Sequence, residues 1–209
     1  MPSGHSHFHR IVVLSVALHH GRMTARNADA GALKDQYHSL TESSRRGEGV
    51  WHTAALRDGL PVYVLTVAPA IAAKITRLEG FFEAIERAAT LKMPGVSRPV
   101  SWGKAGGGEI HCAYVRDADP SPVTPGVKPA AEVALVGSHL ARALAGVHRA
   151  GLVHGAVSMN RILRASDGSV QLGAFGLYPA LVAGGLDRRE VALLLSEIAY
   201  LSPDGRLRG

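Results

Sequence analysis

The residues best suited to chemistry gather between His148 and Leu177. The pattern predicts a loop, two short strands (Arg161–Ala165 and Ser169–Leu172) around an Asp-Gly turn, and a second loop containing glycine. Arg161 offers a positive charge to an anion, and Asn160 offers an amide that could bind a metal. Neither loop contains a carboxylate that could act as a general base.

This stretch resembles the catalytic segment of protein kinases, in which H-x-x-G-[IL]-x-H-R-D-L-K-P-x-N-I-L precedes a hairpin and D-F-G. The matching frame residues are His148, Gly151, His154, Ile162, Leu163, Leu172, Phe175 and Gly176. The catalytic positions of the family instead carry Ala156 for aspartate, Ser158 for lysine, Arg161 for asparagine, and Ala174 for the aspartate of D-F-G, which becomes AFG. The resemblance therefore implies loss of the base and of both metal ligands.

Two of these differences from the family lead to a testable expectation. Ala156 and Ala174 match loop positions that are partly solvated in the family, so aspartate is expected to be tolerated there. Activity would not return, because the other catalytic positions remain altered. Asn160, one residue before the metal-ligand position, is the alternative ligand if it slips into that place.

Three antiparallel strands are predicted at Tyr37–Ser43, Gly49–Ala55 and Leu60–Val67. The third resembles the kinase strand P-V-A-[IL]-K-V-L, with Leu65 at the position of the lysine. In the family that lysine contacts the phosphates of ATP and pairs with a glutamate. Leucine can do neither.

The loop between the first two strands corresponds to the glycine-rich loop of kinases, which covers the ATP phosphates. It keeps Gly47 and Gly49, followed by Val50, and Glu48 would place a carboxylate near the phosphates. A plain hairpin turn is the preferred interpretation of this short G-x-G.

The clearest helix is predicted over Ala72–Lys92, because apolar residues recur every three or four positions and Pro94 ends the pattern. It resembles the kinase regulatory helix, whose pairing glutamate falls on Ala84. Glu83 lies about 100° away around the helix. Leu65 and Ala84 thus replace both ends of the ion pair, which avoids leaving a lone buried charge.

Two more strands, Val100–Gly103 and Ile110–Val115, are predicted, and Ala113-Tyr114-Val115 would form the hinge between two lobes. A second long helix is predicted to begin at Pro129. Kinases place a long helix there, under the catalytic loop.

Two interpretations remain open for the segment after Gly176. Asp187 and Glu190 have the spacing of a helix start, and this helix matches the central helix of a kinase C-lobe. Alternatively, Tyr200–Asp204 resembles Y-[LM]-A-P-E, which would make residues 187–198 part of a helical activation segment. The first interpretation is preferred. In both, the C-lobe is incomplete.

Residues 1–36 are expected to form a disordered leader. His5, His7 and His9 alternate there and could form a loose metal-binding arm, but no carboxylate or cysteine completes a ligand set. The true start could also be Met23.

Composition narrows the functional classes. The chain has 209 residues, 46% of them apolar, a formal net charge of +6 and a single cysteine, which excludes an internal disulfide framework. The positive net charge is not accompanied by the combination of aromatic and basic residues that is typical of nucleic-acid-binding surfaces. No run reaches the roughly 20 apolar residues of a membrane span. A bacterial, cytoplasmic protein is expected.

The resemblance predicts an α+β, protein kinase-like fold with two lobes. The N-lobe, residues 37–116, would hold a small antiparallel sheet and one regulatory helix, and the C-lobe, residues 117–209, would be truncated and mainly helical. A vestigial nucleotide cleft would be formed by Gly47, Gly49, Val50, Leu65, Ala113, Val115, Asn160, Arg161, Phe175 and Gly176. His154 and Asp187 would have structural roles.

The expected function is that of a pseudokinase, a catalytically inactive kinase-like domain that serves a protein partner as scaffold or regulator. No catalytic residue, metal site or cofactor is expected, and nucleotide binding is not favoured. Two alternatives remain: an atypical Ser/Thr protein kinase that uses ATP and magnesium, and a truncated, non-functional fragment.

Overall fold

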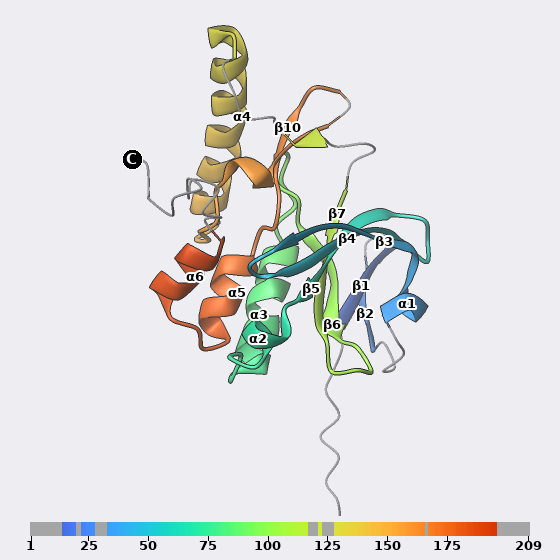
Figure 1. Ribbon diagram of the computed structural model, residues 1–209. Helices are drawn as coiled ribbons and strands as arrows, with labels where there is room; N and C mark the ends of the chain where they lie inside the picture. Colours follow the sequence, from blue (N-terminus) through green and yellow to red (C-terminus); the bar gives the residue numbers. More distant parts are fainter. Residues whose placement is uncertain are drawn as a thin grey trace, which may run out of the picture.

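The computed structural model describes residues 14–19, 22–27, 33–116, 121–122, 128–165 and 167–195. An antiparallel sheet with the helix α3 (Leu78–Ala89) forms the N-lobe, and a partial, mainly helical C-lobe lies beside it (Figure 1). The predicted α+β, kinase-like two-lobed architecture is confirmed.

Five strands of the sheet correspond to predicted strands, with neighbours in the order β6-β7-β5-β4-β3. They are β3 (Tyr37–Arg46), β4 (Gly49–Leu56), β5 (Pro61–Val67), β6 (Pro99–Lys104) and β7 (Ile110–Val115). Side chains alternate between the two faces of each strand. Trp51 and Leu65 therefore join the core that α3 covers, whereas Val62 and Val64 pack on the opposite face.

The N-terminal segment contributes two further strands, β1 (Leu14–His19) and β2 (Arg22–Asn27), and the short helix α1 (Leu33–Gln36). β1 pairs with β2 and also with the edge strand β6, through Ser15 and Ser101. In these segments the structure differs from the expected disordered leader, because an edge strand offers unpaired backbone groups that another strand can pair with. His5, His7 and His9 lie outside the described residues.

The helix predicted over Ala72–Lys92 is divided into α2 (Pro69–Ala72) and α3 (Leu78–Ala89). Between them the chain turns toward the C-lobe, where the backbone N–H of Arg77 donates to the carbonyl of Gly184 at 2.9 Å. Periodicity alone could not show this break, since the hydrogen bond at this point joins residues more than 100 positions apart.

The C-lobe contains the remaining elements. They are β8 (Ser121–Pro122), α4 (Ala130–Arg149), the 3-10 helix η1 (Met159–Arg161), β9 (Ile162–Arg164), β10 (Val170–Leu172), α5 (Leu177–Ala183) and α6 (Arg188–Leu195). The predicted hairpin is confirmed by the antiparallel pairing of β9 and β10.

α4 meets the length and composition criterion for a membrane-crossing helix, which the sequence interpretation did not expect. A helix in the core of a folded domain can meet the same criterion. One side of α4 is packed here: Ala143, Gly146 and Val147 are buried, and Val136 and Leu140 contact the hairpin cluster.

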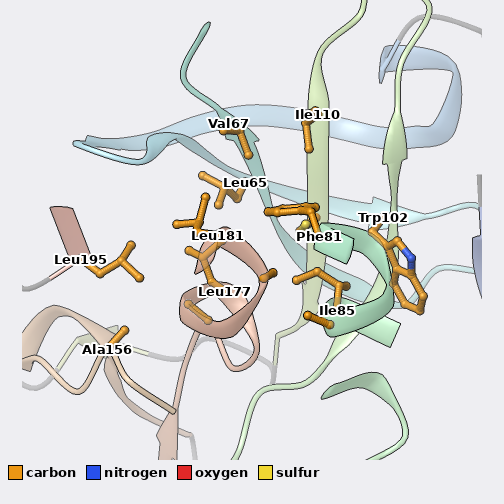
Figure 2. Packing of buried hydrophobic residues seen from close by; sticks show 14 of the residues in the cluster. Leu65, Val67, Phe81, Ile85, Trp102, Ile110, Ala156, Leu177, Leu181 and Leu195 are labelled. Atoms are coloured by element: carbon orange, nitrogen blue, oxygen red, sulfur yellow. The ribbon is translucent and has the colours of Figure 1, made fainter. Parts of the chain in front are cut away.

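α6 begins where the preferred interpretation placed its helix. Asp187 caps the helix as predicted, because its Oδ1 accepts hydrogen bonds from the backbone N–H groups of Arg189 and Glu190. Val191 and Leu195 belong to the same apolar cluster as Leu65 of the N-lobe, and Figure 2 shows Leu195 in it. α6 packs on α5 of the C-lobe and also reaches Gly47 of the N-lobe through Leu194. Tyr200–Asp204 lies outside the described residues.

Candidate functional site

Four of the positions that the resemblance assigns to charged catalytic groups lie in one buried apolar cluster. Leu65, Ala84, Ala156 and Ala174 are 0, 3, 4 and 3% exposed. Figure 2 shows Leu65 and Ala156 with Phe81, Leu181 and Leu195 in this cluster. A charge at Leu65, Ala84 or Ala156 would be removed from water without a partner, which is energetically costly. The expected partly solvated environment is therefore wrong for Ala156, whereas Ala174, although buried, lines the cavity described below.

The AFG segment is held by packing. Ala174 has a φ of 59°, an uncommon value for a residue other than glycine. Phe175 is buried against Ala88, Val96 and Val147. Gly176 precedes α5 with a φ of 87°, and a Cβ on it would collide with the Cβ of Ala88 in α3. These positions connect α3 to the C-lobe.

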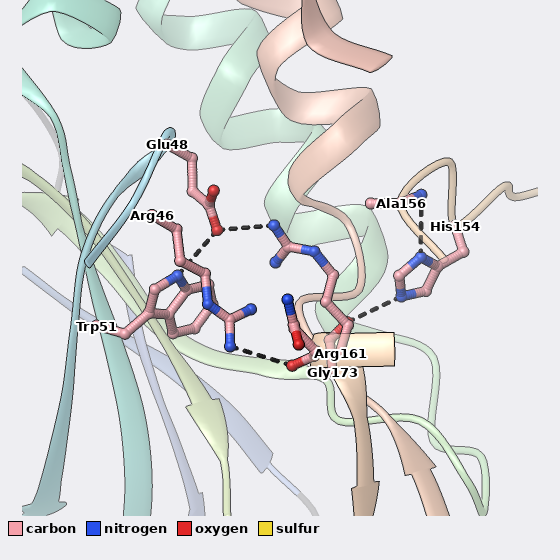
Figure 3. Close-up of polar contacts among 8 residues, drawn as sticks. Arg46, Glu48, Trp51, His154, Ala156, Arg161 and Gly173 are labelled. Carbon is pink, nitrogen blue, oxygen red and sulfur yellow. Dashed lines mark hydrogen bonds and ion pairs between the residues drawn. The ribbon is translucent and has the colours of Figure 1, made fainter. Parts of the chain in front are cut away.

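His154 ties the catalytic loop to the end of the hairpin. Its Nε2 lies 2.9 Å from the carbonyl oxygen of Gly173, and its Nδ1 accepts a hydrogen bond from the backbone N–H of Ala156 at 3.2 Å (Figure 3). These partners indicate a neutral ring with the proton on Nε2. Burial lowers the pKa of His154 to about 4, so the ring stays neutral at physiological pH. The geometry suits the predicted structural role.

The centre of the site is a buried ion pair between the lobes. Arg161 Nη2 lies 2.7 Å from Glu48 Oε1, and each side chain is 1% exposed. The same Glu48 oxygen accepts a hydrogen bond from Trp51 Nε1 at 2.9 Å. The guanidinium carbon of Arg161 lies 6.0 Å from the centre of the Trp51 ring. Because Glu48 neutralises it, Arg161 does not offer a free charge to an anion.

A second arginine crosses to the same loop. Arg46 Nη2 donates to the backbone carbonyl of Asn160 at 3.1 Å (Figure 3), and its guanidinium carbon lies 5.8 Å from the Trp51 ring centre. The side-chain oxygen of Ser158 is buried, with no hydrogen-bond partner among the described residues. Asn160 and Arg161 are thus both held by residues next to the β3–β4 turn.

A cavity of about 280 Å³ opens beside the ion pair. It is lined by Ser43, Ser44, Arg46, Trp51, Thr53, Tyr63, Ser97, Tyr114, Asn160, Arg161, Leu163, Gly173 and Ala174. Three aromatic rings and several hydroxyl groups make it suitable for a small planar molecule. The Tyr114 hydroxyl is buried, without a hydrogen-bond partner in the described part of the chain.

Only part of the predicted cleft lines this cavity, namely Asn160 and Arg161. Ala113 is buried on the other face of the sheet, where Val115 also packs. The aromatic lining of Trp51, Tyr63 and Tyr114 was missed. The sequence did contain a signal for this lining. Side chains two residues apart in a strand lie on the same face, so Tyr63 lies on the same face of the sheet as Leu65.

Comparison with known proteins identifies the fold. No family model matches the chain. The Mycobacterium tuberculosis PknI kinase domain has a similar structure, with a TM-score of 0.60 and 22% identity, covering 80% of this chain and 74% of that one. The maize SIRK1 kinase domain, solved bound to AMP-PNP, has a TM-score of 0.56 and 15% identity, covering 68% of this chain and 52% of that one.

The chain has a protein kinase-like fold. A stretch of 61 residues is also 44% identical to serine/threonine-protein kinase PknL of M. tuberculosis, and a Mycobacterium bovis PknL matches to the same extent. The matched stretch is 29% of this chain and 15% of PknL.

In this kinase-like fold the glycines of the β3–β4 turn make tight contacts. A Cβ on Gly47 would lie 3.0 Å from Leu194 Cδ1 of α6, and one on Gly49 would overlap the carbonyl oxygen of Thr66. Val50, half-buried in β4, pairs with Arg45 and Thr66. The turn therefore packs onto the protein itself, and its glycines are needed for that packing.

Proposed function

We propose that this chain is a pseudokinase domain: a catalytically inactive, kinase-like domain that binds another protein as scaffold or regulator. One observation carries the proposal. Leu65, Ala84, Ala156 and Ala174 occupy the positions of four charged catalytic groups, and all four are buried in a single apolar cluster. The four changes are mutually consistent, because each of them places an apolar side chain in the same buried cluster.

The lost groups would carry most of the chemistry. Phosphoryl transfer by kinases depends on positioning and on neutralising the charge of the phosphates and metal ions. General-base catalysis alone contributes roughly 10² to 10⁴-fold. None of the four buried residues can bind a metal, accept a proton or pair with a phosphate.

The buried ion pair also argues against magnesium-ATP as a ligand. Glu48 places a carboxylate beside the position of the lost metal ligand, where it would repel phosphate oxygens. A triphosphate bound at this position would have to compete with Glu48 for the charge of Arg161. A protein partner does not require this.

An atypical Ser/Thr protein kinase is the second candidate. The 44% identity with part of PknL favours it, as does the cavity between the lobes. Both candidates are compatible with a kinase-like fold, so a direct assay must separate them.

The test is phosphoryl transfer from labelled ATP with magnesium or manganese to generic protein substrates. We expect no incorporation above a blank without the protein, whereas a serine/threonine-protein kinase run in parallel gives a clear signal. Incorporation that depends on this protein would overturn the proposal. Affinity capture from the native host would then identify partners, with heat-denatured protein as the control for non-specific binding.

A further inference from the structure

Glu48 and Arg161 connect two parts of the molecule that are 113 residues apart in sequence. Glu48 lies in the turn between β3 and β4 of the N-lobe, and Arg161 ends η1 of the C-lobe. The neighbouring contact from Arg46 to the carbonyl of Asn160 joins the same two segments. Figure 3 shows both contacts spanning the space between the lobes.

The pair uses only part of its hydrogen-bonding capacity. Oε2 of Glu48 and both Nε and Nη1 of Arg161 are buried and have no hydrogen-bond partner among the described residues. A buried pair of this kind recovers its desolvation penalty incompletely, so apolar residues could fill the same space at no loss of stability. Its distinctive effect is to specify which two segments meet.

We propose that the Glu48–Arg161 pair is a latch that holds the two lobes closed without any bound ligand. Attraction between opposite charges is strong in a dry interface. The indole of Trp51 fixes the carboxylate from the N-lobe side, which keeps it aimed at Arg161. Closure then needs no nucleotide or metal to bridge the lobes.

If this pair is a latch, a variant that removes one of the two charges should open the lobes. Glu48→Gln keeps the size of the side chain and an oxygen that can accept from Trp51, but it leaves Arg161 as a lone buried charge. Opening the lobes is the simplest way to hydrate that charge. Arg161→Gln leaves Glu48 in the same position, so both variants open the cleft, whereas the double variant has no lone charge and opens less than either.

Lobe separation can be measured with spin labels in the full chain. Glu109→Cys, in the β6–β7 turn, and Arg142→Cys, on α4, are exposed positions in different lobes. The native Cys112 is 0% exposed and is not expected to react. Distances are recorded by pulsed electron paramagnetic resonance without nucleotide.

We expect one narrow distance distribution for the labelled wild-type protein. Glu48→Gln and Arg161→Gln should each add a population at longer distance. Glu132→Gln is the matched control, since it removes the Arg164–Glu132 pair, which has the same 2.7 Å separation but lies within the C-lobe. That variant should keep the wild-type distribution.

Two results would overturn the latch: a broad distribution in the wild-type protein, or an unchanged distribution in Glu48→Gln. If the single variants do not fold, the double variant decides: a longer-distance population supports the latch, and the wild-type distribution rejects it. The distances are measured without nucleotide, so failure of the latch is distinguishable from kinase activity that would overturn the proposed function.

Discussion

Ala156 and Ala174 are both part of a buried apolar core. Both match aspartate positions in the resemblance, yet both contribute to the apolar cluster that contains Leu65 and Leu195. At these two positions the side chains of this chain serve packing.

Returning aspartate to these positions should destabilise the fold. Ala156→Asp buries a carboxylate without a partner and should lower the free energy of unfolding by about 3 kcal/mol, whereas Ala174→Asp, which can face the cavity, should cost less. Denaturant unfolding measures this, with Ala141→Asp on the exposed side of α4 as the matched control, expected to cost under about 1 kcal/mol. Wild-type stability in Ala156→Asp would contradict the apolar cluster.

At the scale of elements, α3 is enclosed by the sheet on one side and by α5 on another. The two helices approach closely because glycine lies at the contacts. A Cβ on Gly80 of α3 would lie 2.9 Å from the carbonyl oxygen of Ala183, and Gly176 meets Ala88 in the same way. This packing connects the AFG segment to the N-lobe.

Gly176→Ala should therefore lower the free energy of unfolding by more than backbone strain alone would. Gly168→Ala is the matched control, because Gly168 also has a positive φ, 80° against 87°, but has no atom within 4 Å of its missing Cβ. We expect a loss of about 1 kcal/mol in the free energy of unfolding for Gly168→Ala and about 3 kcal/mol for Gly176→Ala. Equal losses in denaturant unfolding would mean that α3 and α5 are not tightly packed.

At the scale of the whole molecule, the lobes meet through charge and through packing. The Glu48–Arg161 pair closes one part of the interface, and α6 packs against the β3–β4 turn through Leu194 and Gly47. The cavity of about 280 Å³ remains beside them. The space between the lobes is thus partly filled by the protein itself.

Magnesium-ATP should consequently not raise the melting temperature. A ligand at a hundredfold excess over its Kd stabilises the native state by about 2.7 kcal/mol, which is a shift of several degrees for a domain of this size. We expect no shift with ATP and magnesium, and none with ATP and a chelator, because Glu48 neutralises Arg161.

The control for this experiment is Glu48→Gln, which frees the charge of Arg161. It should show a shift with ATP in chelator if the phosphate can reach that side chain. If the melting temperature of the wild-type protein rises only when ATP and magnesium are both present, the chain contains a metal site. That result would favour the atypical kinase.

The sequence by itself determined most elements of the kinase-like part of the fold. Alternating residues predicted β3, β4 and β5, the Asp-Gly turn predicted the hairpin of β9 and β10, and Asp187 predicted the start of α6. These features depend on neighbours within a few residues, so local patterns are enough to find them. The frame of histidine and glycine residues then placed them in a kinase-like order.

Only the tertiary structure decided how distant segments meet. The sequence contained Glu48 and Arg161 but could not show that they form one buried pair, because no local pattern relates residues 113 positions apart. It predicted an apolar face on α6 without specifying the surface that covers it. Burial of an apolar face is not directional, so the packing of α6 on α5, with Leu194 against Gly47, depended on which complementary surfaces the rest of the chain supplied.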